Sequence, residues 1–185
     1  MNREEILSAF KDGRIDLEET LSQIDQSYYH DMGHTTLDLD RESRTGAPEV
    51  VFGSGKTAKQ VMEIVEVLLE KNVNTLVTRL DEEKYSALSA SLPECATYTP
   101  NSQLLSVKVK EIELTKSFVA VVSAGTSDHN IAEEAALTAE FFGSKTAQIS
   151  DVGVAGLHRL LARIDEIRKA KVIVVVAGME GALPS

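Results

Sequence analysis

The C-terminal part of the sequence alternates short apolar runs with amphipathic stretches, and this pattern restricts the fold more than any other feature. Residues 118–122, 145–149 and 172–176 have the length and composition of strands. Residues 128–142 and 154–170 repeat apolar positions at helical spacing. The order strand–helix–strand–helix–strand predicts a parallel sheet with right-handed crossovers, in which the strands have the spatial order 2-1-3.

The predicted fold class is α/β, with a parallel doubly wound, flavodoxin-like sheet as its largest part. This nucleotide-binding domain spans 117–185 and follows a helical hairpin at 1–26, a polar linker loop at 27–46 and a small α/β domain at 47–112. The strand at 172–176 is apolar throughout, as in a central strand covered on both faces. Because this strand would otherwise remain an exposed edge, we expect an incomplete domain and a chain truncated at its C-terminus.

Helical spacing also predicts which side chains share a face. In the helix at 154–170, the apolar positions are expected to pack inward against the sheet. In the hairpin, each helix is expected to carry one apolar face, and Asp16 with Glu19 forms a capping-box-like start for the second helix. The apolar positions are Leu157, Leu160, Leu161, Ile164 and Ile167 in the last helix, Ile6, Leu7 and Phe10 in the first, and Leu17, Leu21 and Ile24 in the second.

The composition restricts the partners. The sequence has 29 acidic and 19 basic residues and a net charge of −10. No nucleic-acid or anionic-membrane surface is expected, since both need an excess of Lys and Arg. The single Cys95 cannot form an intramolecular disulfide and suits a reducing compartment. Because the start of the chain has no signal-peptide pattern and no apolar run is long enough to span a bilayer, we expect a cytoplasmic protein.

Three loops rich in Gly and small residues follow the three predicted strands, at 123–128, 150–156 and 177–184. All three leave the carboxyl ends of parallel strands, so they are expected to meet at one edge of the sheet, where ligands of open α/β sheets bind. Gly lets the backbone approach a ligand closely, and helix N-termini favour anions. One such loop would indicate only a tight turn, but three converging loops favour a ligand site.

Three other motifs are weaker. The sequence Gly-Ser-Gly-Lys-Thr at 53–57 is similar to a P-loop, but the P-loop pattern requires Gly where this chain has Val50, which disfavours an ATPase. His30 and His34 stand four residues apart without a further ligand nearby, so a structural role is favoured over a metal site. Cys95 has no basic neighbour in sequence that would favour its thiolate, and we interpret it as a small, buried apolar residue.

The three loops also carry a family resemblance. Ser-Ala-Gly-Thr-Ser-Asp at 123–128, Asp-Val-Gly-Val-Ala-Gly-Leu-His-Arg at 151–159 and Val-Ala-Gly-Met-Glu-Gly-Ala-Leu-Pro-Ser at 176–185 resemble the family related to aminoimidazole ribonucleotide carboxylase. More closely, these loops and the stretch 38–57 resemble its branch of pyridinium-3,5-biscarboxylic acid mononucleotide synthases. The purine-pathway carboxylases of this family carry a catalytic histidine after the second strand, whereas this chain has Ser-Asp-Val-Gly-Val at 150–154.

The resemblance implies an enzyme of nickel-pincer nucleotide cofactor biosynthesis. Such a synthase adds carbon from CO2 or bicarbonate to the pyridinium ring of nicotinic acid adenine dinucleotide. It also hydrolyses the phosphoanhydride, which yields pyridinium-3,5-biscarboxylic acid mononucleotide and AMP. The resemblance further implies a homo-oligomer, expected as an octamer, and no tightly bound cofactor, with a requirement for Mg²⁺ left open. Two alternatives stay open: an aminoimidazole ribonucleotide carboxylase or mutase of purine synthesis, and a non-catalytic nucleotide-binding module.

The resemblance also implies roles for single residues. Glu180 and Asp128 are the candidate catalytic residues: Glu180 as the base that removes a ring proton, and Asp128 as a ligand of ribose hydroxyls or a metal, with a purely capping role as the alternative. The nucleophilic cysteine of the family falls beyond Ser185 and does not match Cys95, so the chain alone is not expected to complete the reaction. The candidate substrate-binding residues are Arg41, Arg44, Gly125, Thr126, Ser127, Asp151, Gly153, Gly178, Met179 and Gly181. The backbone at 125–127 is expected to hold a phosphate, and the two arginines either clamp a second phosphate or are surface charges.

Overall fold

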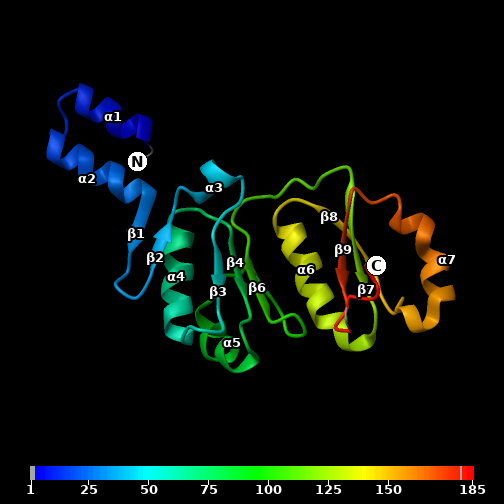
Figure 1. The fold of residues 1–185 in the computed structure, drawn as a ribbon. Helices are drawn as coiled ribbons and strands as arrows, with labels where there is room; N and C mark the ends of the chain where they lie inside the picture. The colour runs from blue at the N-terminus through cyan, green and yellow to red at the C-terminus, as the bar shows by residue number, and fades with distance from the viewer. Residues whose placement is uncertain (1–2, 180) are drawn as a thin grey trace. The chain divides into compact units, whose positions relative to one another are not determined.

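The computed structural model describes residues 3–179 and 181–185, which form a mixed α/β fold. The chain divides into two units, Met1–Val50 and Val51–Ser185. Figure 1 shows the helices and strands of each unit. Among the described residues, no helix is both long enough and apolar enough to cross a membrane.

The first unit begins with the two predicted helices, α1 (Arg3–Lys11) and α2 (Leu17–Tyr28). The Asp16 carboxylate accepts a hydrogen bond from the Glu19 N–H at 2.8 Å, so it caps the start of α2 as the sequence predicts. Ile6 is buried with only 2% of its surface exposed, whereas Leu7, predicted to share its face, is 53% exposed. The apolar stripe of α1 is therefore only partly covered.

The prediction of an irregular loop at 27–46 is wrong, because this segment holds a hairpin and a short helix. The elements are β1 (Tyr29–Asp31), antiparallel to β2 (Thr36–Asp38), and α3 (Arg41–Thr45). The hairpin turn is held by the Asp31 carboxylate, which accepts a hydrogen bond from the Gly33 N–H at 2.8 Å, and Gly33 has a φ of 78°. Strands of three residues are too short to show the alternation that predicts a strand from sequence.

The second unit holds two sheets, of which the first has the strand order β3-β4-β6-β5. Both β4 and β5 are antiparallel to β6. The strands are β3 (Val50–Phe52), β4 (Thr75–Thr78), β5 (Ala96–Thr99) and β6 (Leu104–Val107), and the helices are α4 (Ala58–Glu70), α5 (Glu82–Leu88) and the 3₁₀ helix η1 (Ser89–Ser91). The sequence does not predict β6, whose four side chains are all buried, because so short an apolar run has no diagnostic period.

The second sheet is parallel, with the order β8-β7-β9, which confirms the predicted order 2-1-3. Its elements are β7 (Phe118–Ser123), η2 (Thr126–Asp128), α6 (His129–Phe141), β8 (Lys145–Ile149), η3 (Val154–Gly156), α7 (Leu157–Ile167) and β9 (Val172–Val176). Val121 packs with Ala132 and Ala136 of α6. Ala120 packs in a second cluster with Ile167 of α7. Because successive residues of a strand point to opposite faces, α6 and α7 cover opposite faces of this sheet.

The predicted inward face of α7 is only partly correct. Leu160 and Ile167 pack against the sheet. Leu157 and Leu161 are instead 53% and 57% exposed. Five apolar positions in eleven helical residues span more of the helix surface than one sheet face covers, so two of them point outward.

Replacing Thr57 by alanine is expected to destabilise the protein by about 0.5–2 kcal/mol. The Thr57 hydroxyl accepts a hydrogen bond from the Gln60 N–H at 3.2 Å, and the Gln60 side chain accepts one from the Thr57 N–H at 2.9 Å. This capping box satisfies two N–H groups at the start of α4. Urea unfolding measures the loss. The exposed Thr97 in β5 gives a matched control, and an equal loss for Thr97→Ala would show that the cap is not responsible.

Candidate functional site

The loops that follow the three parallel strands are joined by backbone hydrogen bonds. The Val152 N–H donates to the Ser123 carbonyl at 3.2 Å, and the Gly153 N–H donates to the Ala124 carbonyl at 2.9 Å. The Ala124 N–H donates to the Val176 carbonyl at 3.1 Å. The first loop is thus bonded to the second loop and to the last residue of β9, after which the third loop starts, as the sequence predicts for loops that leave the same edge of a sheet.

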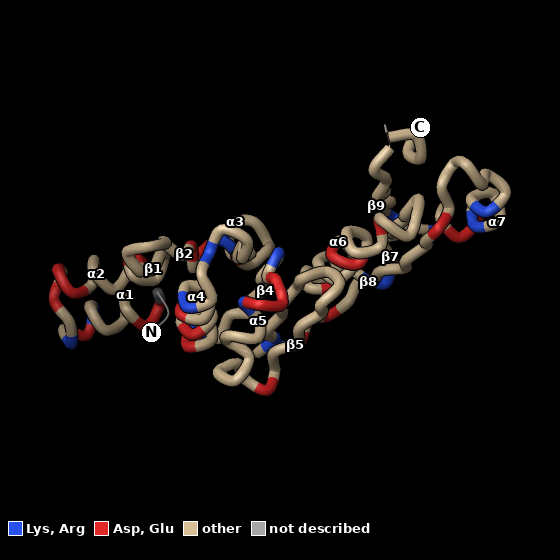
Figure 2. Tube along the Cα trace, turned by 90° about the horizontal axis from the view of Figure 1, so that it is seen from below, with Lys and Arg blue, Asp and Glu red and all other residues tan. Residues whose placement is uncertain are grey.

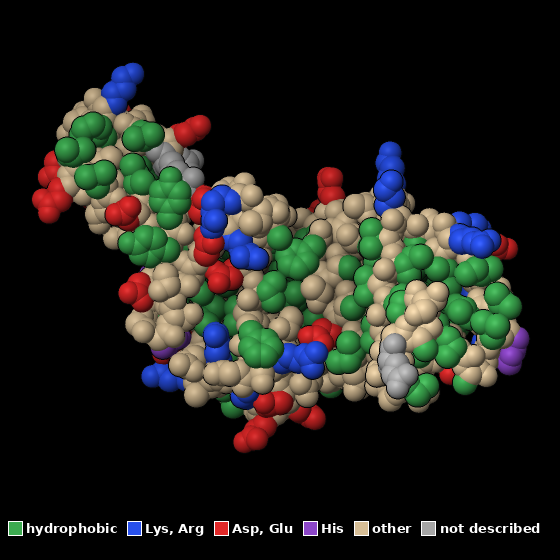
Figure 3. Space-filling view, viewed as in Figure 1, with side chains coloured by type: hydrophobic (Ala, Val, Ile, Leu, Met, Phe, Trp, Pro, Cys, Tyr) green, Lys and Arg blue, Asp and Glu red, His purple; other side chains and the backbone are tan. Residues whose placement is uncertain are grey.

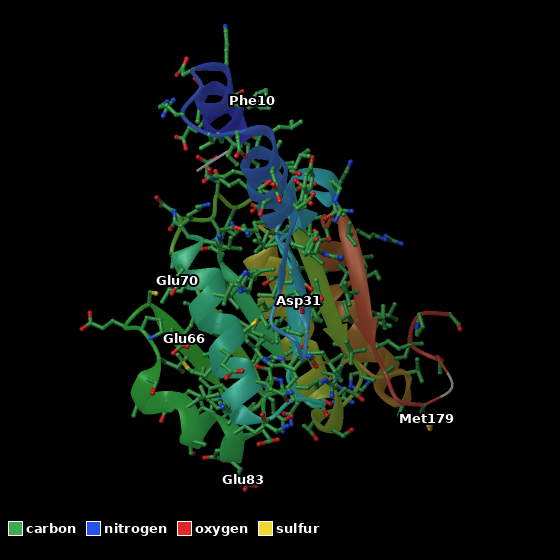
Figure 4. The ribbon with its side chains drawn as sticks, turned by 90° about the vertical axis from the view of Figure 1, so that its left-hand side faces the viewer. Phe10, Asp31, Glu66, Glu70, Glu83 and Met179 are labelled. Carbon is green, nitrogen blue, oxygen red and sulfur yellow. The ribbon has the colours of Figure 1, made fainter. Side chains whose placement is uncertain are left out.

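The three loops line a cavity of about 410 Å³. Six of the predicted site residues contribute to it: Gly125, Ser127, Asp128, Gly153, Gly178 and Met179. Met179 is 71% exposed and lies in the segment that follows β9 (Figure 4). The other lining residues, which the sequence does not single out, are Ala124, Val154, Ala155, Ala177, Ala182 and Leu183. These side chains are small and apolar and have no reactive or charged group. Only their position in the three loops could have predicted that they line a ligand site.

Asp128 is the one charged side chain among the described residues of the cavity lining. Its Oδ2 accepts a hydrogen bond from the Gly125 N–H at 2.9 Å, so it reaches back across its own loop and does not cap α6. A Cβ atom built on Gly178 would lie 3.7 Å from Oδ1, which places the third loop beside the same carboxylate. The same bond caps the turn at η2, so the capping role considered from sequence is found there and not at the start of α6. This carboxylate can accept a hydrogen bond from a ligand hydroxyl.

Gly153 allows the second loop to approach the first. A Cβ atom at this position would lie 2.9 Å from the Ala124 carbonyl oxygen, closer than real Cβ contacts. The requirement for glycine is steric, since the backbone approach leaves no room for a side chain.

Three predicted binding residues, Asp151, Thr126 and Gly181, lie beside the cavity lining without belonging to it. Asp151 is exposed, has a φ of 59° and forms an ion pair with Arg159, so its carboxylate is engaged within the second loop and the following helix. Thr126 is exposed in η2. Gly181 has a φ of 64°, in the left-handed region that favours glycine, and lies two residues before Leu183 of the lining. The binding roles predicted for these residues stay predictions.

Glu180, the candidate base, lies outside the described residues. Its described neighbours Gly178 and Met179 line the cavity. Its catalytic role stays a prediction.

Arg41 and Arg44 belong to the first unit, where both are exposed in α3. The Arg44 guanidinium forms ion pairs with Asp38 and with Asp40, the latter at 3.3 Å. The Asp38 carboxylate, through its hydrogen bond and its charge, raises the pKa of Arg44. The phosphate clamp predicted for the two arginines stays a prediction.

The loop Gly-Ser-Gly-Lys-Thr at 53–57 has its carbonyl groups bound by a lysine. The Lys84 ammonium donates to the Gly53 and Ser54 carbonyl oxygens, each at 3.1 Å. A P-loop holds phosphate by pointing backbone N–H groups at a ligand. In this loop, two of the carbonyl groups are instead bound by a lysine of the same chain. Among the described residues, no three His, Cys, Asp or Glu side chains gather in a way that could hold a metal ion.

Comparison with known proteins gives two findings. The model of the LarB/PurE-like N-terminal domain family matches residues 29–110. An uncharacterized protein of Methanocaldococcus jannaschii is 38% identical over 192 residues, which cover 100% of this chain and 75% of the relative. The similarity to that relative therefore includes the three loops as well as the segment matched by the family model.

Proposed function

The chain belongs to the LarB/PurE-like family, and from this premise we propose that it carboxylates the pyridinium ring of nicotinic acid adenine dinucleotide. In the same proposal it hydrolyses the phosphoanhydride, so that the products are pyridinium-3,5-biscarboxylic acid mononucleotide and AMP. The family as a whole supports a carboxylase-related function. The specific substrate is our proposal, and it places the protein in nickel-pincer nucleotide cofactor biosynthesis, in the cytoplasm and as a homo-oligomer.

The observation that carries the proposal is the cavity between the three loops. Its volume of about 410 Å³ lies in the range of small-molecule sites. Small and apolar residues form most of its described lining, and such walls suit a flat aromatic ring. The one described carboxylate, Asp128, can accept hydrogen bonds from ribose hydroxyls at the same place.

The pyridinium ring must become electron-rich before one of its carbons can react with CO2. A pyridinium ring is electron-poor, and the addition of a thiolate to a ring carbon turns it into a neutral dienamine, a form of covalent catalysis. The dienamine carbon at ring position 5 then forms a bond to CO2. Loss of the proton from that carbon and expulsion of the thiolate restore the aromatic pyridinium. Water cleaves the phosphoanhydride, which releases AMP.

Roles for this chain's residues follow from that sequence of steps. Glu180 is proposed as the base that takes the ring proton, because a carboxylate in a small loop can accept it directly. Asp128 is proposed to hold a ribose. The N–H groups of the first loop and the pair Arg41 and Arg44 are proposed to bind the two phosphates. Cys95 is exposed, so the expectation that it is buried is wrong. It also lies outside the described cavity lining, and the proposal assigns no role to it.

Calorimetry tests the choice of substrate. We expect nicotinic acid adenine dinucleotide and AMP to bind, and aminoimidazole ribonucleotide to bind at least about tenfold more weakly, a difference of about 1.4 kcal/mol. Ala155→Trp places a large ring in the cavity and should abolish binding, whereas Thr97→Trp, at an exposed position in β5, should not. The reverse order of affinities would assign the protein to the purine-pathway reaction instead.

A further inference from the structure

Two exposed apolar surfaces lie on helices of the described chain. The hairpin surface consists of Leu7, Phe10, Leu17 and Leu21, which are 53%, 42%, 60% and 55% exposed. The α7 surface consists of Val154, Leu157 and Leu161, which are 41%, 53% and 57% exposed. In Figure 3, hydrophobic side chains gather over α1 and α2 and again over α7.

Both surfaces are additional to the faces that the helices bury. In the hairpin, Ile6 and Ala9 are buried. In α7, Leu160 and Ile167 pack on the sheet. α1 and α7 each therefore have an inner apolar face that packs within their own unit and an outer apolar face that contacts solvent, whereas the buried residue of α2 is Thr20. Contiguous groups of exposed apolar side chains are typical of sites that bind another molecule.

The two surfaces have opposite charge around them. Residues 3–28, which include α1 and α2, contain seven acidic and three basic residues, whereas residues 157–171, which include α7, contain five basic and two acidic ones. Figure 2 shows the acidic residues along α1 and α2 and the basic residues at α7. The basic excess around α7 stands out in a chain whose net charge is −10.

The charges lie on the apolar stripes themselves. In α2, Asp25 follows Leu21 by four residues and is exposed on the same side of the helix. In the α7 segment, Arg168 follows Leu161 by seven residues, which is two helical turns, and is also exposed. The α2 stripe thus ends in an acidic residue, whereas the α7 stripe carries the exposed Asp165 before the basic Arg168, so the opposite signs belong to the two segments as a whole.

We propose that the hairpin surface of one copy docks on the α7 surface of a second copy. A surface that paired with its own copy would bring like charges together, which is unfavourable, whereas the hairpin–α7 pairing joins apolar groups and opposite charges. Because Val154 also lines the cavity, the docked hairpin lies at the rim of the candidate site.

Cysteine cross-linking between differently substituted chains tests the docking. Three single-cysteine chains are prepared with Cys95→Ser: one with Leu21→Cys, one with Leu161→Cys and one with Lys59→Cys. All three positions are exposed, so the fold should be kept, which circular dichroism checks. An equimolar mixture of the Leu21→Cys and Leu161→Cys chains, treated with a short bismaleimide, should give a linked pair containing one of each as the main product. The mixture of Leu21→Cys with Lys59→Cys should not.

Several results would overturn the proposal. The absence of a linked pair in the first mixture, or equal linking in the second, would show that the two surfaces do not meet. A chain carrying both Leu21→Cys and Leu161→Cys that links only within itself would show docking inside one copy. Added salt should reduce the expected linking, because exposed charges are screened within about 8–10 Å at moderate ionic strength. Linking that is insensitive to salt would contradict the role of charge.

Discussion

Replacing Glu180 by glutamine is expected to slow turnover by about 10²–10⁴-fold, the usual contribution of a general base. Glutamine has the shape of glutamate and can still accept a hydrogen bond, so the affinity for nicotinic acid adenine dinucleotide should change only a few-fold. It cannot take the ring proton, and the carboxylated intermediate therefore does not return to the aromatic pyridinium. AMP release and formation of the carboxylated mononucleotide are measured in the shortest form of the gene product that turns over.

Glu113 provides a matched control for this change, because it is an exposed glutamate outside the described cavity lining. Glu113→Gln should leave both turnover and binding unchanged. If Glu180→Gln turned over at the wild-type rate, the assignment of the base would be wrong. Asp128→Asn would then be the next variant to measure, because Asp128 is the charged residue of the described lining.

The second large effect is expected at Gly153. An alanine Cβ would meet the Ala124 carbonyl oxygen at 2.9 Å, and a backbone atom cannot move aside without shifting the loop. Overpacking of this kind destabilises proteins by about 1–3 kcal/mol. The shift would also separate two walls of the cavity, so Gly153→Ala should weaken binding of the dinucleotide by at least about tenfold, or about 1.4 kcal/mol.

Gly55 distinguishes this steric effect from a general effect of replacing glycine. A Cβ atom at Gly55 meets nothing within 4 Å. Gly55→Ala should therefore leave the free energy of unfolding within about 1 kcal/mol of the wild-type value, and can raise it by restricting the unfolded chain. Equal losses of stability and binding for both variants would contradict the role of close loop packing. Thermal unfolding and calorimetry measure the two quantities.

The parallel sheet could be predicted from the sequence because its strands and helices are long enough to show their periods. Three of the shorter strands were not predicted: β1 and β2 have three residues each, and β6 has four. At this length neither alternation nor helical spacing is visible, and pairing with a neighbouring strand decides the structure. Helical spacing identified the apolar residues of α7, but it did not show which of them the sheet covers. Leu157 and Leu161, which were predicted to face the sheet, are exposed.

The location of the site could be predicted from the sequence, but the contacts within it could not. The glycine-rich loops after parallel strands predicted where a cavity forms, and topology alone brings such loops together. The hydrogen bond from the Gly125 N–H to Asp128 and the approach of Gly153 to Ala124 depend on backbone geometry that no sequence pattern specifies. The Arg44 guanidinium forms ion pairs with Asp38 and Asp40. These ion pairs were not predicted from the sequence.

Carbon labelling tests the proposed reaction most directly. The shortest form of the gene product that turns over is incubated with nicotinic acid adenine dinucleotide and ¹³C-bicarbonate, and the products are separated and weighed by mass spectrometry. The proposal predicts a pyridinium mononucleotide with one labelled carboxylate on ring position 5, formed together with an equal amount of AMP. Label transferred to aminoimidazole ribonucleotide, with none on the pyridinium ring, would contradict it.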